Sequence, residues 1–395
     1  MPAIPVSARA RAISDSVTLA IQARAKAMRA EGVDVVSLGA GEPDFDTPEN
    51  IQDAGVQAIR DGHTRYTAVS GMPELRTAAA KWFNRHFDLD YSKEEIIVTA
   101  GAKPALSLGL TAVLNDGDRV LLPAPFWPSY PDIVRIAGGV PVPLEAVPEQ
   151  GFVHTPDQLA KAFAETGAKG VMFNYPNNPS GAIATREQVE GLLKVCIDHN
   201  AWIVSDEIYA RLLYDGAKHV SFAALDGGKE RTMIVNGGTK SHSMTGWRVG
   251  FLAAPKEIAA AVGRIQGQAI GNTCTISQHA AITVCEETDN TELERRLETY
   301  DGRRRLMVER VSAIDGLAVN LPQGAFYAMV DCRPVCQRAG INDIEFCERL
   351  LIEGKVATVP GTAFELPGFL RLSYAASTDA IETAIDRLGT FVKSL

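Results

Sequence analysis

The sequence lacks the features that mark a membrane-spanning or secreted protein. It contains no apolar run approaching the roughly 18 residues that a helix needs to cross a bilayer. Residues 1–15, "MPAIPVSARARAISD", hold no apolar stretch of the kind found in a secretory signal. We therefore expect a cytoplasmic protein that does not associate with membranes.

An excess of positive charge and a cysteine framework are missing as well. The 39 basic and 48 acidic residues give a net charge of −9, whereas nucleic-acid binding needs a clustered basic face. The six cysteines are scattered, and the pair Cys332 and Cys336 has no second pair or histidine at zinc-site spacing. These absences argue against a nucleic-acid partner, and they predict reduced thiols and no metal site.

What remains is the composition of an ordinary globular protein, 46% hydrophobic and 22% charged, in a chain of 395 residues that is too long for one compact core. From about residue 95, short β-branched runs alternate with helical patterns. The alternation predicts an α/β fold with a mostly parallel sheet covered on both faces, and pocket residues at the carboxyl ends of the strands. We expect strands at 94–101, 118–123, 169–174, 201–207, 231–237 and 248–254, and helices at 102–114 and 185–200.

The chain changes character after about residue 290. A charged helical stretch at 291–314 leads into shorter segments, and a final helix is expected at about 378–394. The shorter segments are 325–331, 345–354, 356–359 and 369–374. We predict a large domain over residues 48–290 and a smaller α+β domain formed by residues 1–47 and 291–395.

The stretch "NGGTKSHSMTGWRVG" (236–250) places Lys240 in a loop of small residues, with Arg248 further along the same loop. Taken alone, such a lysine is more often a solvated surface charge, because short patterns have a high false-positive rate. The rest of the chain has to decide between a surface charge and a chemical role.

Three other stretches lie at predicted strand ends. Asp206 in "SDEIY" closes one strand, and the loop "NYPNNPSG" (174–181) ends another. "TAGAKP" (99–104) opens a helix, whose free N–H groups and positive dipole end suit a phosphate. Each has an ordinary structural explanation as a helix cap or turn. Together, however, a phosphate seat, a lysine in a small-residue loop and a buried carboxylate describe a site for pyridoxal 5′-phosphate.

The sequence resembles fold-type I, class I pyridoxal-phosphate-dependent aminotransferases of the aspartate aminotransferase family along nearly its whole length. The resemblance implies a large domain with a mostly parallel seven-stranded sheet flanked by helices, and a smaller α+β domain. The motifs that carry it are "SLGAGEPDFDTP" (37–48), "YTAVSGMPELR" (66–76), "PAPFWPSYPDI" (123–133), "NYPNNPSG", "SDEIY", "TKSHSMTGWRVG" (239–250), "PQGAFY" (322–327) and "FLRLSY" (369–374).

Position by position, Lys240 matches the family's catalytic lysine, which holds the cofactor as a Schiff base and moves the substrate proton. Asp206 matches the partner of the pyridine nitrogen. The resemblance assigns further cofactor contacts to Gly101, Ala102, Lys103, Trp127, Asn178, Tyr209, Thr239 and Arg248. It thus implies a transaminase that alternates between the aldehyde and amine forms of the cofactor.

The resemblance also implies substrate contacts and a homodimer. Arg371 matches the guanidinium that clamps the substrate α-carboxylate, a role that suits a planar fork better than lysine. Gly39, Trp127 and Asn178 also match substrate-binding positions. Tyr66 matches a tyrosine that reaches the phosphate in the neighbouring subunit, which implies composite active sites.

One departure from the family pattern concerns the phosphate. Gly237 stands three positions before the lysine, where the family often has a serine, and Thr239 stands where serine or alanine is commoner. The phosphate is therefore expected to depend more on Arg248, Thr239 and the helix end.

The choice of substrate rests on weaker features. Lys103 and the hydroxyls of Ser14 and Ser16 fit a branch of the family that recognises dicarboxylates, although Asp15 between the serines could repel an acidic substrate. Aspartate with 2-oxoglutarate is the leading prediction, with aromatic or small neutral amino acids as alternatives.

Other readings remain open at this point. A C–S lyase or a cyclopropane-forming synthase could share the fold and break a different bond. A dinucleotide-dependent dehydrogenase is disfavoured, because "GAGEPD" lacks the third glycine and the helix that this fingerprint requires. A regulator with an aminotransferase-like domain would need a DNA-binding module, for which the N-terminal segment is too short.

Overall fold

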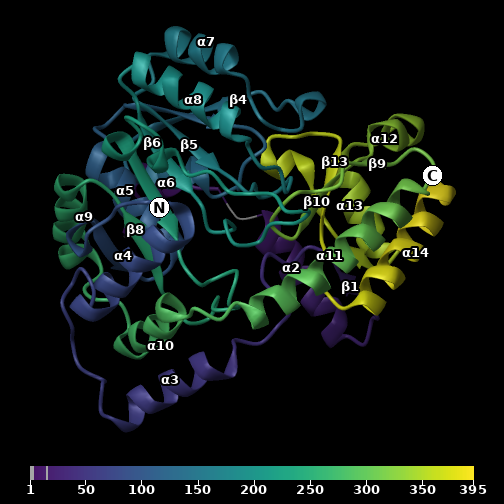
Figure 1. The fold of residues 1–395 in the computed structure, drawn as a ribbon. Coiled ribbons are helices and arrows are strands. Elements are labelled where there is room, and N and C mark those ends of the chain that lie inside the picture. Colours follow the sequence, from purple (N-terminus) through teal and green to yellow (C-terminus); the bar gives the residue numbers. More distant parts are fainter. Residues whose placement is uncertain (1–3, 15–16) are drawn as a thin grey trace.

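The computed structural model describes residues 4–14 and 17–395, and its centre is a seven-stranded sheet of order β2-β8-β7-β6-β5-β3-β4 (Figure 1). β8 runs antiparallel to both of its neighbours, and the other strand pairs are parallel. The predicted α/β fold with a mostly parallel sheet is confirmed. The strands are β2 (Ile96–Thr99), β3 (Arg119–Pro123), β4 (Val140–Leu144), β5 (Gly170–Asn174), β6 (Trp202–Asp206), β7 (Thr232–Asn236) and β8 (Gly250–Ala253).

Helices cover both faces of this sheet because alternate side chains of each strand point to opposite sides. On one face, residues such as Leu122 and Val204 pack against α5 (Ala102–Val113), α6 (Tyr130–Ile136) and α9 (Lys256–Ala269). On the other, residues such as Ile203 and Phe251 pack against α4 (Pro73–Phe87), α7 (Pro156–Thr166), α8 (Arg186–Asp198) and α10 (Thr275–Glu286). Burial on both faces explains why the strands read as continuous apolar runs.

Two segments add strands that the prediction did not contain. β4 was not among the expected strands; it lies at the sheet edge, where the missing N–H groups of Pro141 and Pro143 are tolerated. The segment at 356–359, for which no helix or strand was predicted, forms two strands in different sheets, β11 (Val356–Ala357) and β12 (Val359–Pro360). Thr358 lies where the chain passes from one sheet to the other.

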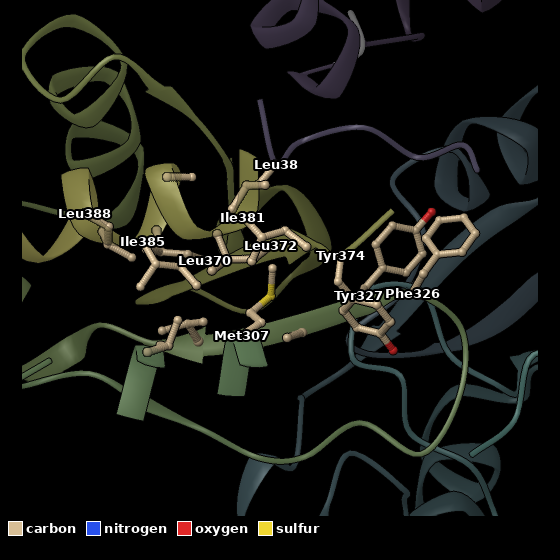
Figure 2. Close-up of a cluster of buried hydrophobic side chains, with 14 of the residues drawn as sticks. Leu38, Met307, Phe326, Tyr327, Leu370, Leu372, Tyr374, Ile381, Ile385 and Leu388 are labelled. Carbon is tan, nitrogen blue, oxygen red and sulfur yellow. The ribbon is translucent and has the colours of Figure 1, made fainter. Parts of the chain in front are cut away.

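A second region contains a four-stranded sheet of order β12-β13-β10-β9, with β9 (Ala318–Val319), β10 (Tyr327–Asp331) and β13 (Phe369–Ser373). A two-stranded sheet pairs β1 (Val36–Ser37) with β11, and so attaches the N-terminal segment. Figure 2 shows Met307, Leu372 and Ile385 pointing toward one another from α11 (Thr291–Ser312), β13 and α14 (Thr378–Ser394). α12 (Arg333–Ala339) and α13 (Asp343–Ile352) complete this region.

Three helices belong to the N-terminal part of the chain: α1 (Ala8–Arg11), α2 (Val17–Ala30) and α3 (Glu49–Arg60). α3 packs against α10 along one side of the molecule (Figure 1). Of the helices in the described residues, none has the length and apolar character needed to cross a bilayer. The division into domains at residues 47/48 and 290/291 stays a prediction.

Candidate active site

The strand ends of the large sheet open into one cavity of about 360 Å³. β2, β5, β6 and β7 run in the same direction, so their carboxyl ends lie at the same edge of the sheet. The predicted residues that line the cavity are Ala102, Lys103, Trp127, Asn178, Asp206, Tyr209, Thr239, Lys240, Arg248 and Arg371. These positions, spread over most of the chain, therefore share one site.

Lys240 lies in the turn that follows β7, and its amine faces the cavity. The Nζ atom donates a hydrogen bond of 2.6 Å to the backbone oxygen of Gly41 and lies 5.9 Å from the centre of the Tyr209 ring. Burial lowers the pKa of Lys240 to about 8, with Arg371 and Arg248 adding to the effect. The amine therefore loses its proton much closer to neutral pH than an ordinary lysine does.

Asp206 ends β6 and is 4% exposed. Its Oδ2 accepts a 2.8 Å hydrogen bond from the Tyr130 hydroxyl, and its Oδ1 accepts one of 3.2 Å from the backbone N–H of Ile208. Burial raises the pKa of Asp206 to about 6, while the Tyr130 hydroxyl opposes that rise. The carboxylate is thus held in place and is ionised at neutral pH.

The opposite end of the cavity is suited to an anion. α5 begins at Ala102 after Gly101, which has a φ of +100° and leaves the first N–H groups without a side-chain cap. A Cβ on Gly101 would lie 2.8 Å from Nη2 of Arg248, so the guanidinium occupies the space that glycine leaves. Arg248 donates to the backbone oxygens of Ala100 and Thr245 and, among the described residues, forms no ion pair.

Arg371 lies in the middle of β13 and is 3% exposed. Its guanidinium donates to Oδ1 of Asn178 at 3.0 Å and to the oxygen of Gly39 at 2.9 Å, and its central carbon is 4.4 Å from the centre of the Tyr327 ring. Nε has no hydrogen-bond partner among the described residues, and no described carboxylate pairs with this arginine. Burial lowers the pKa of Arg371, as expected for a buried cation without a counter-ion.

Aromatic rings and one lysine form the remaining walls of the cavity. The Tyr209 hydroxyl is hydrogen-bonded to that of Tyr327 at 2.8 Å. The Lys103 amine lies 4.6 Å from the centre of the Trp127 ring and donates to Oγ of Ser129 at 3.1 Å. Lys103 is thus a cation at the cavity wall.

Some predicted residues lie outside this cavity. Gly39 adjoins it through its contact with Arg371, and Gly101 through Arg248. Tyr66 is not part of the lining and is 97% exposed. Of the hydroxyls near the N-terminus, Ser14 is exposed and does not line the cavity, and Ser16, like Asp15, falls outside the described residues.

Sequence reasoning missed several residues of the lining. Tyr130 and Tyr327 lie within motifs that carried the resemblance, "PAPFWPSYPDI" and "PQGAFY", but received no role. Asn174 joins two strand ends, because its side chain donates to the backbone oxygen of Asp206 and accepts from the N–H of Asn178. The first residue of the "NYPNNPSG" motif was the available signal for it.

Comparisons with known proteins identify the family of the chain. Residues 33–388 match the family described as aminotransferase class I and II. The chain is 43% identical to an aspartate aminotransferase of Bacillus sp. (strain YM-2) over 387 residues, 98% of each chain. It is 41% identical to the aspartate/prephenate aminotransferase of Thermus thermophilus over 384 residues, 97% of each chain.

The chain is also similar to solved structures of aspartate aminotransferases. The aspartate aminotransferase of Rhizobium meliloti matches with a TM-score of 0.95 at 39% identity, over 99% of both chains. The aspartate aminotransferase of Thermus thermophilus, solved with maleate, matches with a TM-score of 0.93 at 40% identity, over 98% of this chain and 100% of that one. The chain therefore belongs to the class I and II aminotransferase family and is itself a transaminase.

Proposed function

We propose that this enzyme transfers the amino group of L-aspartate to 2-oxoglutarate, with pyridoxal 5′-phosphate held at Lys240. The observation that carries the proposal is that the Lys240 amine, the Asp206 carboxylate and the Arg371 guanidinium face one cavity of about 360 Å³. The names of the relatives support aspartate over aromatic substrates.

The residues present fit the cofactor. At one end, the start of α5, Thr239 and Arg248 suit a phosphate, and the space beside Gly101 is filled by the guanidinium. At the other end, Asp206 is a buried carboxylate without a cationic partner among the described residues, which suits a protonated ring nitrogen. Lys240 would hold the aldehyde carbon, Trp127 would contact the ring, and the hydroxyl of Tyr209 and the amide of Asn178 would hydrogen-bond to the ring oxygen.

When bound, pyridoxal phosphate supplies an electron-accepting ring that stabilises the negative charge left when an amino acid loses its α-proton. Asp206 would hold a proton on the ring nitrogen. Lys240 would be released as an amine when the substrate's amino group takes its place on the aldehyde carbon, and would then take the proton from the substrate Cα; burial already lowers the pKa of this amine to about 8. Arg371 would bind the substrate α-carboxylate and so orient Cα.

Lys103 is the candidate residue for binding the substrate's second carboxylate. Its amine faces the cavity, and among the described residues it has no acidic partner. Burial, followed by repulsion from Arg248, lowers the pKa of Lys103, so a carboxylate beside it would be favourable. This supports a dicarboxylic amino acid as donor.

The test is a screen of amino donors with 2-oxoglutarate as acceptor. The donors are aspartate, phenylalanine, alanine and the amino acid that forms when prephenate is transaminated. We expect aspartate to give the highest kcat/KM. Release of pyruvate and ammonia from a sulfur amino acid such as cystathionine, without an added 2-oxo acid, would instead indicate a C–S lyase. Phenylalanine turnover above that of aspartate would overturn the proposed substrate.

We further propose that the enzyme is a homodimer in which Tyr66 completes the cavity of the partner subunit. The resemblance assigns this role to Tyr66, and its almost full exposure leaves it free to contact a neighbouring subunit, since tyrosine is enriched at protein interfaces. Mixing inactive Lys240→Ala and Tyr66→Ala subunits tests it. Regained activity supports shared sites, whereas no regain from confirmed mixed dimers contradicts them.

A further inference from the structure

Two segments distant in sequence meet at the Lys240 amine. One is residues 239–248, which we call the lysine turn, and the other is residues 39–47, which we call the strap. The Lys240 Nζ donates to the oxygen of Gly41 in the strap at 2.6 Å, and the Thr245 hydroxyl donates to Glu42 at 3.1 Å. The position of the amine therefore depends on how these two segments are held relative to each other.

Arg296 of α11 binds both segments with a single guanidinium. Nη1 donates to Oγ of Ser243 in the lysine turn at 2.8 Å, and Nη2 donates to the oxygen of Asp46 in the strap at 2.7 Å. Nε donates to Glu292 of the same helix at 2.7 Å, so each guanidinium nitrogen has a partner. Arg296 is 4% exposed, and its planar fork fixes both contacts in one geometry.

The strap lies on α11 through further contacts. Asp44 pairs with Arg303 at 2.9 Å. The Phe45 ring lies 5.3 Å from that of Tyr300 and 5.2 Å from the guanidinium of Arg296. α11 is thus the surface against which the strap is placed, and Arg296 is where this surface reaches the lysine turn.

The contact in the lysine turn falls on an unusual backbone position. Ser243 has a φ of +53°, a region that side-chain-bearing residues rarely adopt and keep only when their surroundings hold them. Its hydroxyl is held by Arg296, and its carbonyl accepts a 2.7 Å hydrogen bond from Thr47 of the strap. Ser243 is one of two residues of the lysine turn with a positive φ, the other being Arg248 at +52°, and Arg296 supports the conformation of Ser243.

We propose that Arg296 is a positioning residue that fixes the lysine turn against the strap and thereby aims the Lys240 amine at the reacting atoms. It touches neither cofactor nor substrate in this scheme, and the inference rests on the proposed role of Lys240. Loss of Arg296 releases Ser243 and Asp46 together and admits water beside Lys240.

The first measurement uses the full-length apoprotein, so that it does not depend on the proposed function. The extent of reductive methylation of Lys240 is measured at a series of pH values by mass spectrometry of the peptide that contains it. The charged groups near the Lys240 amine are Glu42, Asp206, Arg371 and Arg248. We expect Arg296→Met to move the labelling midpoint of Lys240 upward by about one pH unit, because hydration favours the charged amine. The matched control is Arg295→Met, since Arg295 shares Glu292 and the Phe45 ring but reaches neither Ser243 nor Asp46.

The second measurement uses the loaded enzyme. We expect Arg296→Met to lower kcat about tenfold with a smaller change in KM, and Arg296→Lys to restore only part of it, because one amine cannot reproduce the fork. Ser243→Ala, a milder change, should lower kcat in the wild type and have no further effect in Arg296→Met. The proposal is overturned if the Lys240 midpoint and kcat are unchanged in Arg296→Met, or if Arg295→Met changes them equally.

Discussion

Two buried charged residues of the cavity lining, Asp206 and Arg371, differ in how completely their own protein pairs them. Asp206, at the end of β6, accepts hydrogen bonds from its own protein on both oxygens. Arg371, in the middle of β13, donates to two neutral oxygens and leaves Nε without a partner among the described residues. The large sheet therefore fixes the charge that we propose for the cofactor, whereas the small sheet leaves incompletely paired the cation that we propose for a substrate carboxylate.

The strongest way to break this comparison is to neutralise Asp206. Asp206→Asn keeps the size of the side chain and an oxygen for Tyr130, but it removes the charge that stabilises a ring-nitrogen proton. We expect kcat to fall about 1,000-fold, the scale seen when one preorganised electrostatic contact is lost from an active site. Steady-state kinetics with a thermal-unfolding control measures this, and a loss below tenfold would show that the carboxylate is not needed in its charged form.

The other side of the comparison is tested by Arg371→Lys, which keeps the positive charge and removes the fork. We expect KM for aspartate to rise about 50-fold with a smaller change in kcat, because one or two charge-assisted hydrogen bonds to the substrate carboxylate are lost. Initial-rate measurements separate the two constants. An unchanged KM would place the α-carboxylate elsewhere.

A smaller effect, confined to substrate choice, is expected at Lys103. Lys103→Ala should lower kcat/KM for aspartate about tenfold and leave that for phenylalanine nearly unchanged, because only aspartate has a second carboxylate. The ratio of kcat/KM for aspartate to that for phenylalanine, measured on the same variant, controls for any general loss of folded enzyme. Equal losses for both substrates would mean that Lys103 serves the cofactor instead.

The smallest effect sharpens the account of Asp206. The Tyr130 hydroxyl lowers the pKa of that carboxyl against the effect of burial, so Tyr130→Phe should raise it from about 6. In the apoprotein the Asp206 carboxyl should then titrate at a higher pH, by about one unit for one hydrogen bond. Infrared difference spectra across pH, with Asp206→Asn to assign the carboxyl band, measure the shift. A titration midpoint that stays in place or moves to lower pH contradicts this role of Tyr130.

The charged residues at the centre of this comparison could be predicted from the sequence, but the side chains that hold them in place could not, for physical reasons. Asp206 was found because it closes a predicted strand and Lys240 because it lies in a loop of small residues after another, and the family resemblance then assigned a role to each. The partners of such residues were not found. Tyr130 reaches Asp206 from a helix 76 positions earlier, and Arg296 reaches Ser243 from 53 positions later. Such pairs depend on side-chain directions that local patterns do not carry.

The fold shows the same division. Strands β5, β6 and β7 were predicted within a residue or two, because burial on both faces makes them uniformly apolar. β4 was missed, because its two prolines are acceptable only at a sheet edge, and the position of an edge is a property of the whole sheet. The proposed role of Tyr66 in a homodimer cannot be tested from the structure of one chain. A residue that contacts only a neighbouring subunit makes no packing contacts within its own chain.

Whether Lys240 carries the cofactor can be measured by trapping its bond to pyridoxal phosphate. The enzyme loaded with pyridoxal phosphate is reduced with borohydride, digested and analysed by mass spectrometry, with Lys240→Ala treated in parallel. The account predicts a phosphopyridoxyl adduct on the peptide containing Lys240 and its loss, together with all turnover, in the variant. An adduct on another lysine such as Lys103, or full turnover by Lys240→Ala, would contradict it.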